Sequence, residues 1–226
     1  MGSNKRILFL GNSYVYYNDL PDMLTKLALS GGHNLFVDSI TKGGAKLEEF
    51  LCKENELCGA LASKIDDKWN YVVLQEQSQI PAILEKREEI MYPSVRVLNK
   101  KIKDYGGETV LFMTWGRHFG DTENGFDSFE SMQEALKVGY TTIAEEIKAL
   151  LAPVGIAWAK AKKIDNDIAL WDKDCSHPSV MGTYLTACVF YSVILKQSPV
   201  GLEYKAGLPK EKAELLQEIA LDIVKF

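Results

Sequence analysis

Arg6-Ile7-Leu8-Phe9-Leu10-Gly11-Asn12-Ser13-Tyr14 contains a run of apolar residues that stops at Gly-Asn. Such a run predicts a buried strand that ends in a tight turn, because Gly and Asn tolerate the backbone angles that a turn requires. Ser13 then stands at the carboxyl end of a central strand, where open α/β sheets bind their ligands. On these residues alone Gly11-Asn12-Ser13 could equally be a plain polar turn, so a second feature elsewhere in the chain has to decide.

The rest of the chain alternates between short β-rich runs and longer helical patterns. We predict strands over residues 34–40, 71–74, 109–114 and 153–157, and helices over residues 20–30, 48–68, 84–105, 129–151, 179–196 and 210–226. Alternation of this kind favours a parallel sheet of about five strands, covered by helices on both faces. There is no internal repeat or linker, so we expect an α/β protein whose single domain spans residues 1–226.

Composition excludes several classes of partner. The 226 residues are 46% hydrophobic and 25% charged, with a formal net charge of −5. Without a basic surface we expect no nucleic-acid partner, and without an apolar stretch near the ~20 residues of a membrane span we expect no membrane. No signal-peptide pattern precedes the first strand, which predicts a cytoplasmic protein, or a secreted or periplasmic one if Met1-Gly2-Ser3 replaces a leader.

Cysteine and histidine spacing predicts neither a disulfide framework nor a metal site. The four cysteines, at positions 52, 58, 175 and 188, form no CxxC pair. Free thiols are the expectation, with a Cys52–Cys58 bridge as the alternative. The three histidines have no HExxH or cysteine-rich context, so we expect no metal and no organic cofactor.

The ends of the predicted strands carry chemically selective residues. They are Ser13, Gly43-Gly44, Gln75 to Ser78, and Trp115 to His118. A hydroxyl nucleophile, a glycine turn with free backbone N–H groups and an amide side chain are the parts that an acyl-transfer site needs.

The deciding feature lies far along the chain, in Asp172-Lys173-Asp174-Cys175-Ser176-His177-Pro178. A histidine three residues after an aspartate can have its Nδ1–H held by that carboxylate, which leaves Nε2 to take a proton from a serine. Asp174 has this spacing, whereas Asp172 would need a wider loop. Together with Ser13, the turn predicts a nucleophile, a general base and an orienting carboxylate.

These two segments resemble the SGNH, or GDSL-like, hydrolase superfamily, and the resemblance runs through nearly the whole chain. Gly11-Asn12-Ser13 is similar to the family's first block, Gly-Asp-Ser, with Asn in place of Asp. Gly44 resembles the glycine whose backbone N–H contributes to the oxyanion hole. Asp174 to Pro178 resembles the last block, and Gly182 matches the glycine that follows it.

The third block departs from the family pattern. The family has Gly-x-Asn-Asp after its third strand, where this chain has Gln75-Glu76-Gln77-Ser78. Gln77 aligns with the oxyanion-hole asparagine and is one methylene longer. The resemblance implies a three-layer, flavodoxin-like sandwich and a serine esterase. Its catalytic residues would be Ser13, His177 and Asp174, and its oxyanion hole would use the N–H groups of Ser13 and Gly44 with the Gln77 amide.

The strings VVLQEQSQ, MTWGR and HPSVMGTYLTA resemble a mostly uncharacterised bacterial subgroup of the superfamily. Many superfamily members remove acyl groups, often acetyl, from carbohydrates, so we expect a small-molecule or carbohydrate ester as substrate. Tyr14, Trp115 and Arg117 are candidate substrate-binding residues, although ordinary core or loop contacts explain them equally well. Two alternatives are a lipase-like or thioesterase activity on the same fold, and a catalytically silent carbohydrate-binding module.

Overall fold

The computed structural model describes residues 4–224 and is built around a parallel sheet of five strands. The strands lie in the order β2-β1-β3-β4-β5. Their bounds are Asn4–Gly11 (β1), Asn34–Thr41 (β2), Tyr71–Leu74 (β3), Glu108–Phe112 (β4) and Leu150–Ala152 (β5). After β1 the chain builds β2 on one side and then crosses to β3 on the other. The carboxyl ends of β1 and β3 therefore form the switch point at which open sheets bind ligands.

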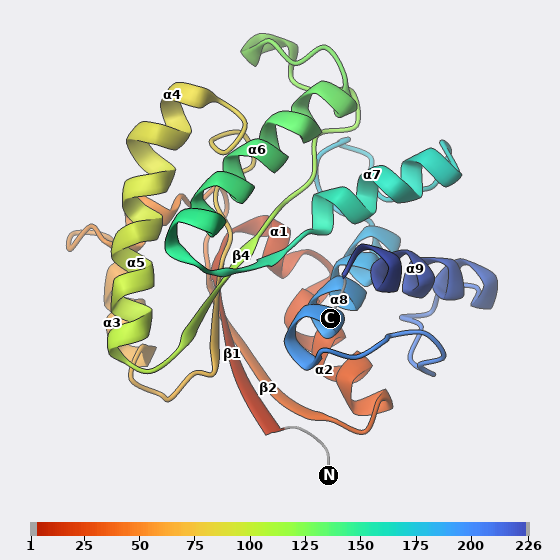
Figure 1. Cartoon of the computed structure of the whole chain (residues 1–226), viewed down its shortest axis with the longest axis horizontal. Helices are drawn as coiled ribbons and strands as arrows, with labels where there is room; N and C mark the ends of the chain where they lie inside the picture. Colours follow the sequence, from red (N-terminus) through yellow and green to blue (C-terminus); the bar gives the residue numbers. More distant parts are fainter. Residues whose placement is uncertain (1–3, 225–226) are drawn as a thin grey trace.

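Helices follow the strands and cover both faces of the sheet (Figure 1). The α-helices are α1 (Ser13–Tyr16), α2 (Leu20–Ser30), α3 (Glu56–Lys64), α4 (Leu84–Lys86), α5 (Tyr92–Asp104), α6 (Phe129–Ile147), α7 (Val154–Ile164), α8 (Val180–Leu195) and α9 (Lys210–Ile223). Short 3₁₀ turns lie at Tyr17–Asp19, Leu47–Phe50 and Thr122–Asn124, and a π-helical turn at Arg87–Met91 joins α4 to α5. The α/β prediction is confirmed.

Strand β1 separates two hydrophobic cores. Its residues alternate, so that Ile7 and Phe9 join the core under α2, α7, α8 and α9, while Leu8 and Leu10 join the core under α3, α5 and α6. All four side chains are fully buried. Burial of each stabilises the fold by roughly 1.5–3 kcal/mol, and a strand buried on both faces needs the unbroken apolar run seen in the sequence.

Helix α8 is buried almost all round and begins three residues after His177. Ser179 caps it, because the Ser179 hydroxyl accepts a hydrogen bond from the Gly182 N–H (3.2 Å). A Cβ on Gly182 would lie 2.3 Å from the Leu170 carbonyl oxygen, so only glycine lets the helix pack this closely. The start of α8 therefore fixes where the chain leaves the histidine turn.

One predicted strand and the end of one predicted helix are wrong. Residues 153–157 are not a strand: they open helix α7, and the fifth strand is the short segment Leu150–Ala152 just before it. A short apolar run does not distinguish a strand from a buried helix turn, and here the apolar pattern continues to Ile164. The helix predicted over 129–151 accordingly ends at Ile147, where Lys148 adopts a left-handed φ of 53°.

The segment predicted as one helix over 48–68 is divided into the 3₁₀ turn at Leu47–Phe50 and helix α3. The last two residues of the helix predicted over 210–226 lie outside the described residues.

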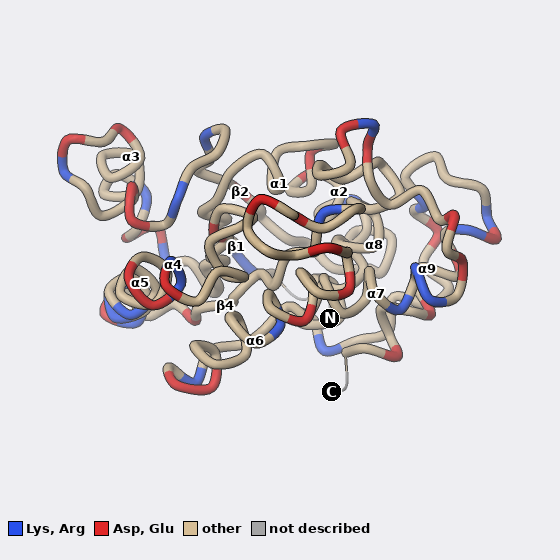
Figure 2. Tube along the Cα trace, turned by 90° about the horizontal axis from the view of Figure 1, so that it is seen from above, with Lys and Arg blue, Asp and Glu red and all other residues tan. Residues whose placement is uncertain are grey.

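Charges are interspersed over the molecule, with Lys and Arg alternating with Asp and Glu along the outer segments (Figure 2). Among residues 4–224, no helix has both the length and the apolar character that crossing a membrane requires. All four cysteines are free thiols.

Candidate active site

Ser13 is the first residue of α1 and stands directly beyond the end of β1. Asn12 caps this helix: its side-chain oxygen accepts a hydrogen bond from the Tyr14 N–H (3.2 Å), and its own N–H donates to Gln75 Oε1 (2.8 Å). Gly11 leaves the space for that second bond, because a Cβ there would lie 2.4 Å from Gln75 Oε1. The close approach of Gln75 thus explains the glycine at position 11, and the cap on helix α1 explains the asparagine at position 12.

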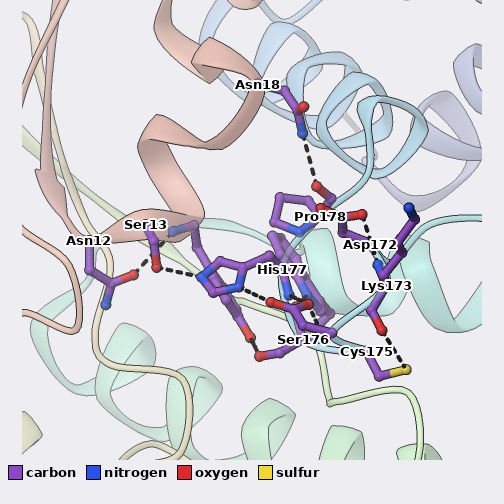
Figure 3. Close-up of polar contacts among 12 residues, drawn as sticks. Asn12, Ser13, Asn18, Asp172, Lys173, Cys175, Ser176, His177 and Pro178 are labelled. Atoms are coloured by element: carbon purple, nitrogen blue, oxygen red, sulfur yellow. Dashed lines mark hydrogen bonds and ion pairs between the residues drawn. The ribbon is translucent and has the colours of Figure 1, made fainter.

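His177 connects Ser13 to Asp174, and Figure 3 shows its imidazole ring pointing toward Ser13. Its Nε2 lies 2.8 Å from Ser13 Oγ, and its Nδ1 hydrogen-bonds Asp174 Oδ2. The other carboxylate oxygen, Oδ1, accepts from the backbone N–H groups of Ser176 (3.0 Å) and His177 (2.9 Å). Partial burial alone would raise the pKa of Asp174, but the hydrogen bonds from the ring and the two N–H groups hold it below its usual value. The carboxylate therefore stays ionised opposite the imidazole.

Asp172 shapes the same turn without touching the imidazole ring. Its carboxylate accepts the N–H of Lys173 (2.8 Å), and its backbone N–H donates to the His177 carbonyl (2.8 Å). Cys175, with a left-handed φ of 61°, closes the turn by donating its N–H to the Asp172 carbonyl (2.9 Å). Of the two aspartates, Asp174 is the one placed to orient the histidine.

A column of stacked rings lies beneath the histidine turn. Tyr14 stacks on Trp115 with centroids 4.6 Å apart, and Trp115 stacks on Trp158 at 4.0 Å. Both upper members hold Ser176: the Tyr14 hydroxyl bonds its Oγ (2.7 Å), and Trp115 Nε1 donates to its carbonyl (3.0 Å). The prediction that Trp115 binds substrate is corrected, because its side chain is fully buried in this column.

Tyr17 covers the imidazole from another side. Its ring stacks on His177 with centroids 4.2 Å apart and planes inclined by 17°. Asn18, the next residue, donates from its side chain to the Pro178 carbonyl (2.9 Å). The segment after α1 therefore fixes both the histidine ring and the backbone behind it.

Ser13 and His177 open into a cavity of about 210 Å³. Gly44, with a φ of +70°, contributes the glycine turn after β2. Gln77 contributes an amide whose oxygen is held by the N–H groups of Gln79 (2.9 Å) and Ile80 (3.3 Å). One amide hydrogen of Gln77 donates to Gln79 Oε1 (3.2 Å), which leaves the second for a ligand. The cavity is lined by Asn12, Ser13, Tyr14, Gly44, Gln77, Ser78, Arg117, Ser176 and His177.

Arg117 reaches the cavity from the loop after β4. Its guanidinium lies 3.7 Å from Asp121, a buried carboxylate that also accepts from the side chains of Gln79 (2.7 Å) and Asn124 (2.8 Å). Through Asp121 the Arg117 loop is joined to the loop that carries Gln77. Arg117 remains a candidate for contact with a polar substrate group.

Two buried residues, to which the sequence analysis gave no role of their own within the stretch Gln75 to Ser78, join the strand ends together. Gln75 accepts from Asn12 and donates to the carbonyl of Glu76 (2.5 Å). Glu76 accepts from the backbone N–H groups of Leu47 (3.2 Å) and Gln77 (2.7 Å), and both side chains are fully buried. The only sequence signal was their polarity at the end of a buried strand.

Comparison with solved structures places this architecture among known hydrolases. A protein from Slackia heliotrinireducens, assigned to the SGNH hydrolases, is 29% identical over 85% of this chain and all of its own, with a TM-score of 0.71. A DUF4886 family protein from Bacteroides uniformis is 17% identical over 97% of this chain and 94% of its own (TM-score 0.80). Axe2, an acetylxylan esterase from Geobacillus stearothermophilus, is 19% identical over 85% of this chain and 95% of its own (TM-score 0.62). No protein-family model matches the chain, and no curated protein matches its sequence.

The sheet order, the serine at the switch point and these structural neighbours define a class, the serine hydrolases that act on ester bonds. Within it, the 29% identity to the Slackia heliotrinireducens protein supports the SGNH/GDSL-like superfamily.

Proposed function

We propose that this protein hydrolyses small acyl esters, acetyl esters above all, that are carried on carbohydrates. The observation that carries the proposal is the hydrogen-bonded series from Ser13 Oγ through His177 to Asp174, opening into a small cavity. A serine hydroxyl is a weak nucleophile until an adjacent base takes its proton, and His177 Nε2 is at the distance for that transfer.

In this mechanism Ser13 Oγ attacks the ester carbonyl while His177 Nε2 accepts the hydroxyl proton. Asp174 holds the ring and stabilises the imidazolium that forms. The oxyanion is bound by the N–H groups of Ser13 and Gly44 and by the free amide hydrogen of Gln77. His177 then gives its proton to the departing alcohol, and a water molecule, activated by the same base, releases the acyl group from Ser13.

The dimensions of the cavity support a small acyl group. A volume of about 210 Å³, shared between the acyl group and the reacting atoms, leaves little room for a long chain. Polar and charged residues such as Gln77, Ser78 and Arg117 lie around it. Each methylene beyond acetyl or propionyl therefore has little space to occupy.

A second hollow supports a carbohydrate as the alcohol. Since His177 protonates the leaving oxygen, the alcohol lies on the side of the histidine turn. A hollow of about 370 Å³ adjoins that turn and contains an exposed phenyl ring, Phe119, with the polar groups of His118, Asn166 and Asp167. Aromatic faces beside carboxylate and amide groups suit the apolar faces and hydroxyls of sugars.

At two places in the chain, adjacent residues line the two different hollows. Arg117 lines the catalytic cavity and His118 the second hollow, and likewise Ser176 lines the first and Cys175 the second. The two segments are joined where the His118 N–H donates to the Cys175 carbonyl (2.9 Å). Axe2, a neighbour of the same fold, is named as an acetylxylan esterase, which agrees with this substrate class.

Labelling with a fluorophosphonate probe tests the enzyme, and a chain-length series tests the acyl group. We expect labelling of the wild type, none in Ser13→Ala, and faster turnover of p-nitrophenyl acetate than of the octanoate. Absence of labelling in the folded wild type would favour the silent binding module. A preference for octanoate would favour the lipase-like alternative.

A further inference from the structure

Glu76 is a buried carboxyl group that the proposed mechanism does not use. It is the second residue after β3 and is fully buried. Its Oε1 accepts two backbone N–H groups, from Leu47 and Gln77, whereas its Oε2 has no hydrogen-bond partner among the described residues. Burying an ionisable group with one oxygen unpaired destabilises the fold, so its presence calls for a structural or functional explanation.

The two N–H groups belong to the two loops that form the candidate oxyanion hole. Leu47 lies three residues after Gly44 in the segment that follows β2, and Gln77 lies in the loop after β3. β2 and β3 are not neighbours in the sheet, because β1 lies between them. One carboxylate oxygen therefore joins, beyond the sheet edge, two loops that no strand pairing connects.

We propose that Glu76 is a positioning residue that sets the distance between the glycine turn and Gln77, and so holds the oxyanion hole in its reactive geometry. This inference rests on the proposed esterase function. An oxyanion site stabilises only the transition state, so an error in its geometry lowers kcat while KM changes little.

The raised pKa of Glu76 agrees with a role other than stabilising the fold. Burial raises the pKa of Glu76 to about 7, even though its two backbone hydrogen bonds act in the opposite direction. The ionised form of Glu76 is therefore disfavoured in the folded protein. Tyr140 on α6 lies nearby, and burial together with the Glu76 charge raises its pKa.

Replacing Glu76 tests the proposal. Glu76→Ala removes both hydrogen bonds, and we expect kcat on p-nitrophenyl acetate to fall about 100-fold with KM changed less than threefold. Glu76→Gln keeps a carbonyl oxygen for the same two N–H groups, so it should recover kcat to within about fivefold of wild type.

Glu49→Ala is the matched control. The Glu49 carboxylate also accepts a backbone N–H in the same segment, that of Lys46 (2.9 Å), but it has no bond to the Gln77 loop. We expect its kcat to stay within twofold of wild type.

If Glu76→Ala does not fold, Glu76→Asp serves instead. Its carboxylate is one methylene too short to reach both N–H groups, and its kcat should fall at least tenfold with KM nearly unchanged. Wild-type kcat in either variant, a rise in KM alone, or a Glu76→Gln variant as impaired as Glu76→Ala would overturn the proposal. Each of these results is separate from a failure of the esterase itself, which would appear as an inactive wild type.

Discussion

At the scale of single residues, the chemistry depends on which carboxylate holds the imidazole. We predict that Asp174→Asn is severely impaired, because the Asp174 carboxylate bonds Nδ1 and stabilises the imidazolium. Loss of an orienting carboxylate lowers turnover by up to ~10⁴-fold. Steady-state hydrolysis of p-nitrophenyl acetate measures the effect, and thermal unfolding verifies that the variant is folded.

Asp172→Asn is the internal control for that experiment. The Asp172 carboxylate bonds the N–H of Lys173 and is exposed, so its charge is near His177 but well screened. A change of about tenfold or less is expected. If Asp172→Asn were the more impaired variant, the assignment of the orienting carboxylate would be wrong by two residues.

Phe119 allows a test of the alcohol side of the site. Its ring is 69% exposed, more than a structural role requires, and it lines the hollow beside the histidine turn. If the ring stacks on a sugar, its loss removes about 1 kcal/mol of binding, and KM for an acetylated xylooligosaccharide rises about fivefold in Phe119→Ala. Phe119→Tyr keeps the ring face and should behave as wild type. Turnover of p-nitrophenyl acetate should be equal in all three proteins, and an equal KM for the oligosaccharide would exclude this hollow.

At the scale of elements, the junction of β1 and α1 depends on a close approach of two loops. We predict that Gly11→Ala lowers the free energy of unfolding by about 2–3 kcal/mol, because the new Cβ would lie 2.4 Å from Gln75 Oε1 and 2.9 Å from Val15. Gln75 is fully buried and hydrogen-bonded at both ends, so it has no free space into which to move. Chemical denaturation measures the loss.

Gly59→Ala is the matched glycine control. Gly59 lies within helix α3, and a Cβ there has no neighbour within 4 Å. Alanine should stabilise this helix by up to about 1 kcal/mol. If both variants were destabilised to the same extent, the close contact between Gly11 and Gln75 would not be the cause of the loss in Gly11→Ala.

The elements also show how far sequence patterns reach. Strands such as Tyr71–Leu74 and helices such as Leu20–Ser30 have the predicted bounds, because their apolar periodicity and their caps agree. The strand predicted over residues 153–157 is wrong because a five-residue apolar run suits a strand and a buried helix turn equally well. The tertiary structure decides: Gly155 packs at the end of β4, where a Cβ would lie 2.1 Å from the Thr114 carbonyl oxygen.

The residues of the candidate site that lie in short sequence motifs could be predicted from the sequence. Ser13 and His177 lie 164 positions apart in the sequence, yet each stands in a short string with its own chemical meaning. Glu76 does not lie in a motif of this kind. Its role depends on the approach of Leu47, which is 29 positions away, and pairings of that kind follow from the fold and not from spacing.

At the scale of the whole molecule, the buried charge of Glu76 should make stability depend on pH. The ordinary pKa of the group is 4.5, and burial raises it to about 7 in the folded protein. Below pH 4.5 Glu76 is protonated in both the folded and the unfolded state, so it carries no ionisation penalty on the free energy of unfolding. As the pH rises to 7 the unfolded state loses this proton first, so unfolding becomes more favourable. Above pH 7 the full penalty, on the order of 3 kcal/mol, is present.

Thermal unfolding of the wild type and Glu76→Gln between pH 5 and pH 8 measures this penalty. Glu76→Gln carries no titrating group at the position, so its melting temperature should exceed that of the wild type by a margin that grows with pH up to about 7 and is then constant. Three other titratable groups act on Glu76, namely Glu48 and Lys46 on the segment after β2 and Tyr140 on α6. All three are present in both proteins, so their effects largely cancel in the difference. A difference that does not change with pH, or one in which the wild type gains relative stability as the pH rises, would show that Glu76 is not a carboxyl with a raised pKa in the folded protein.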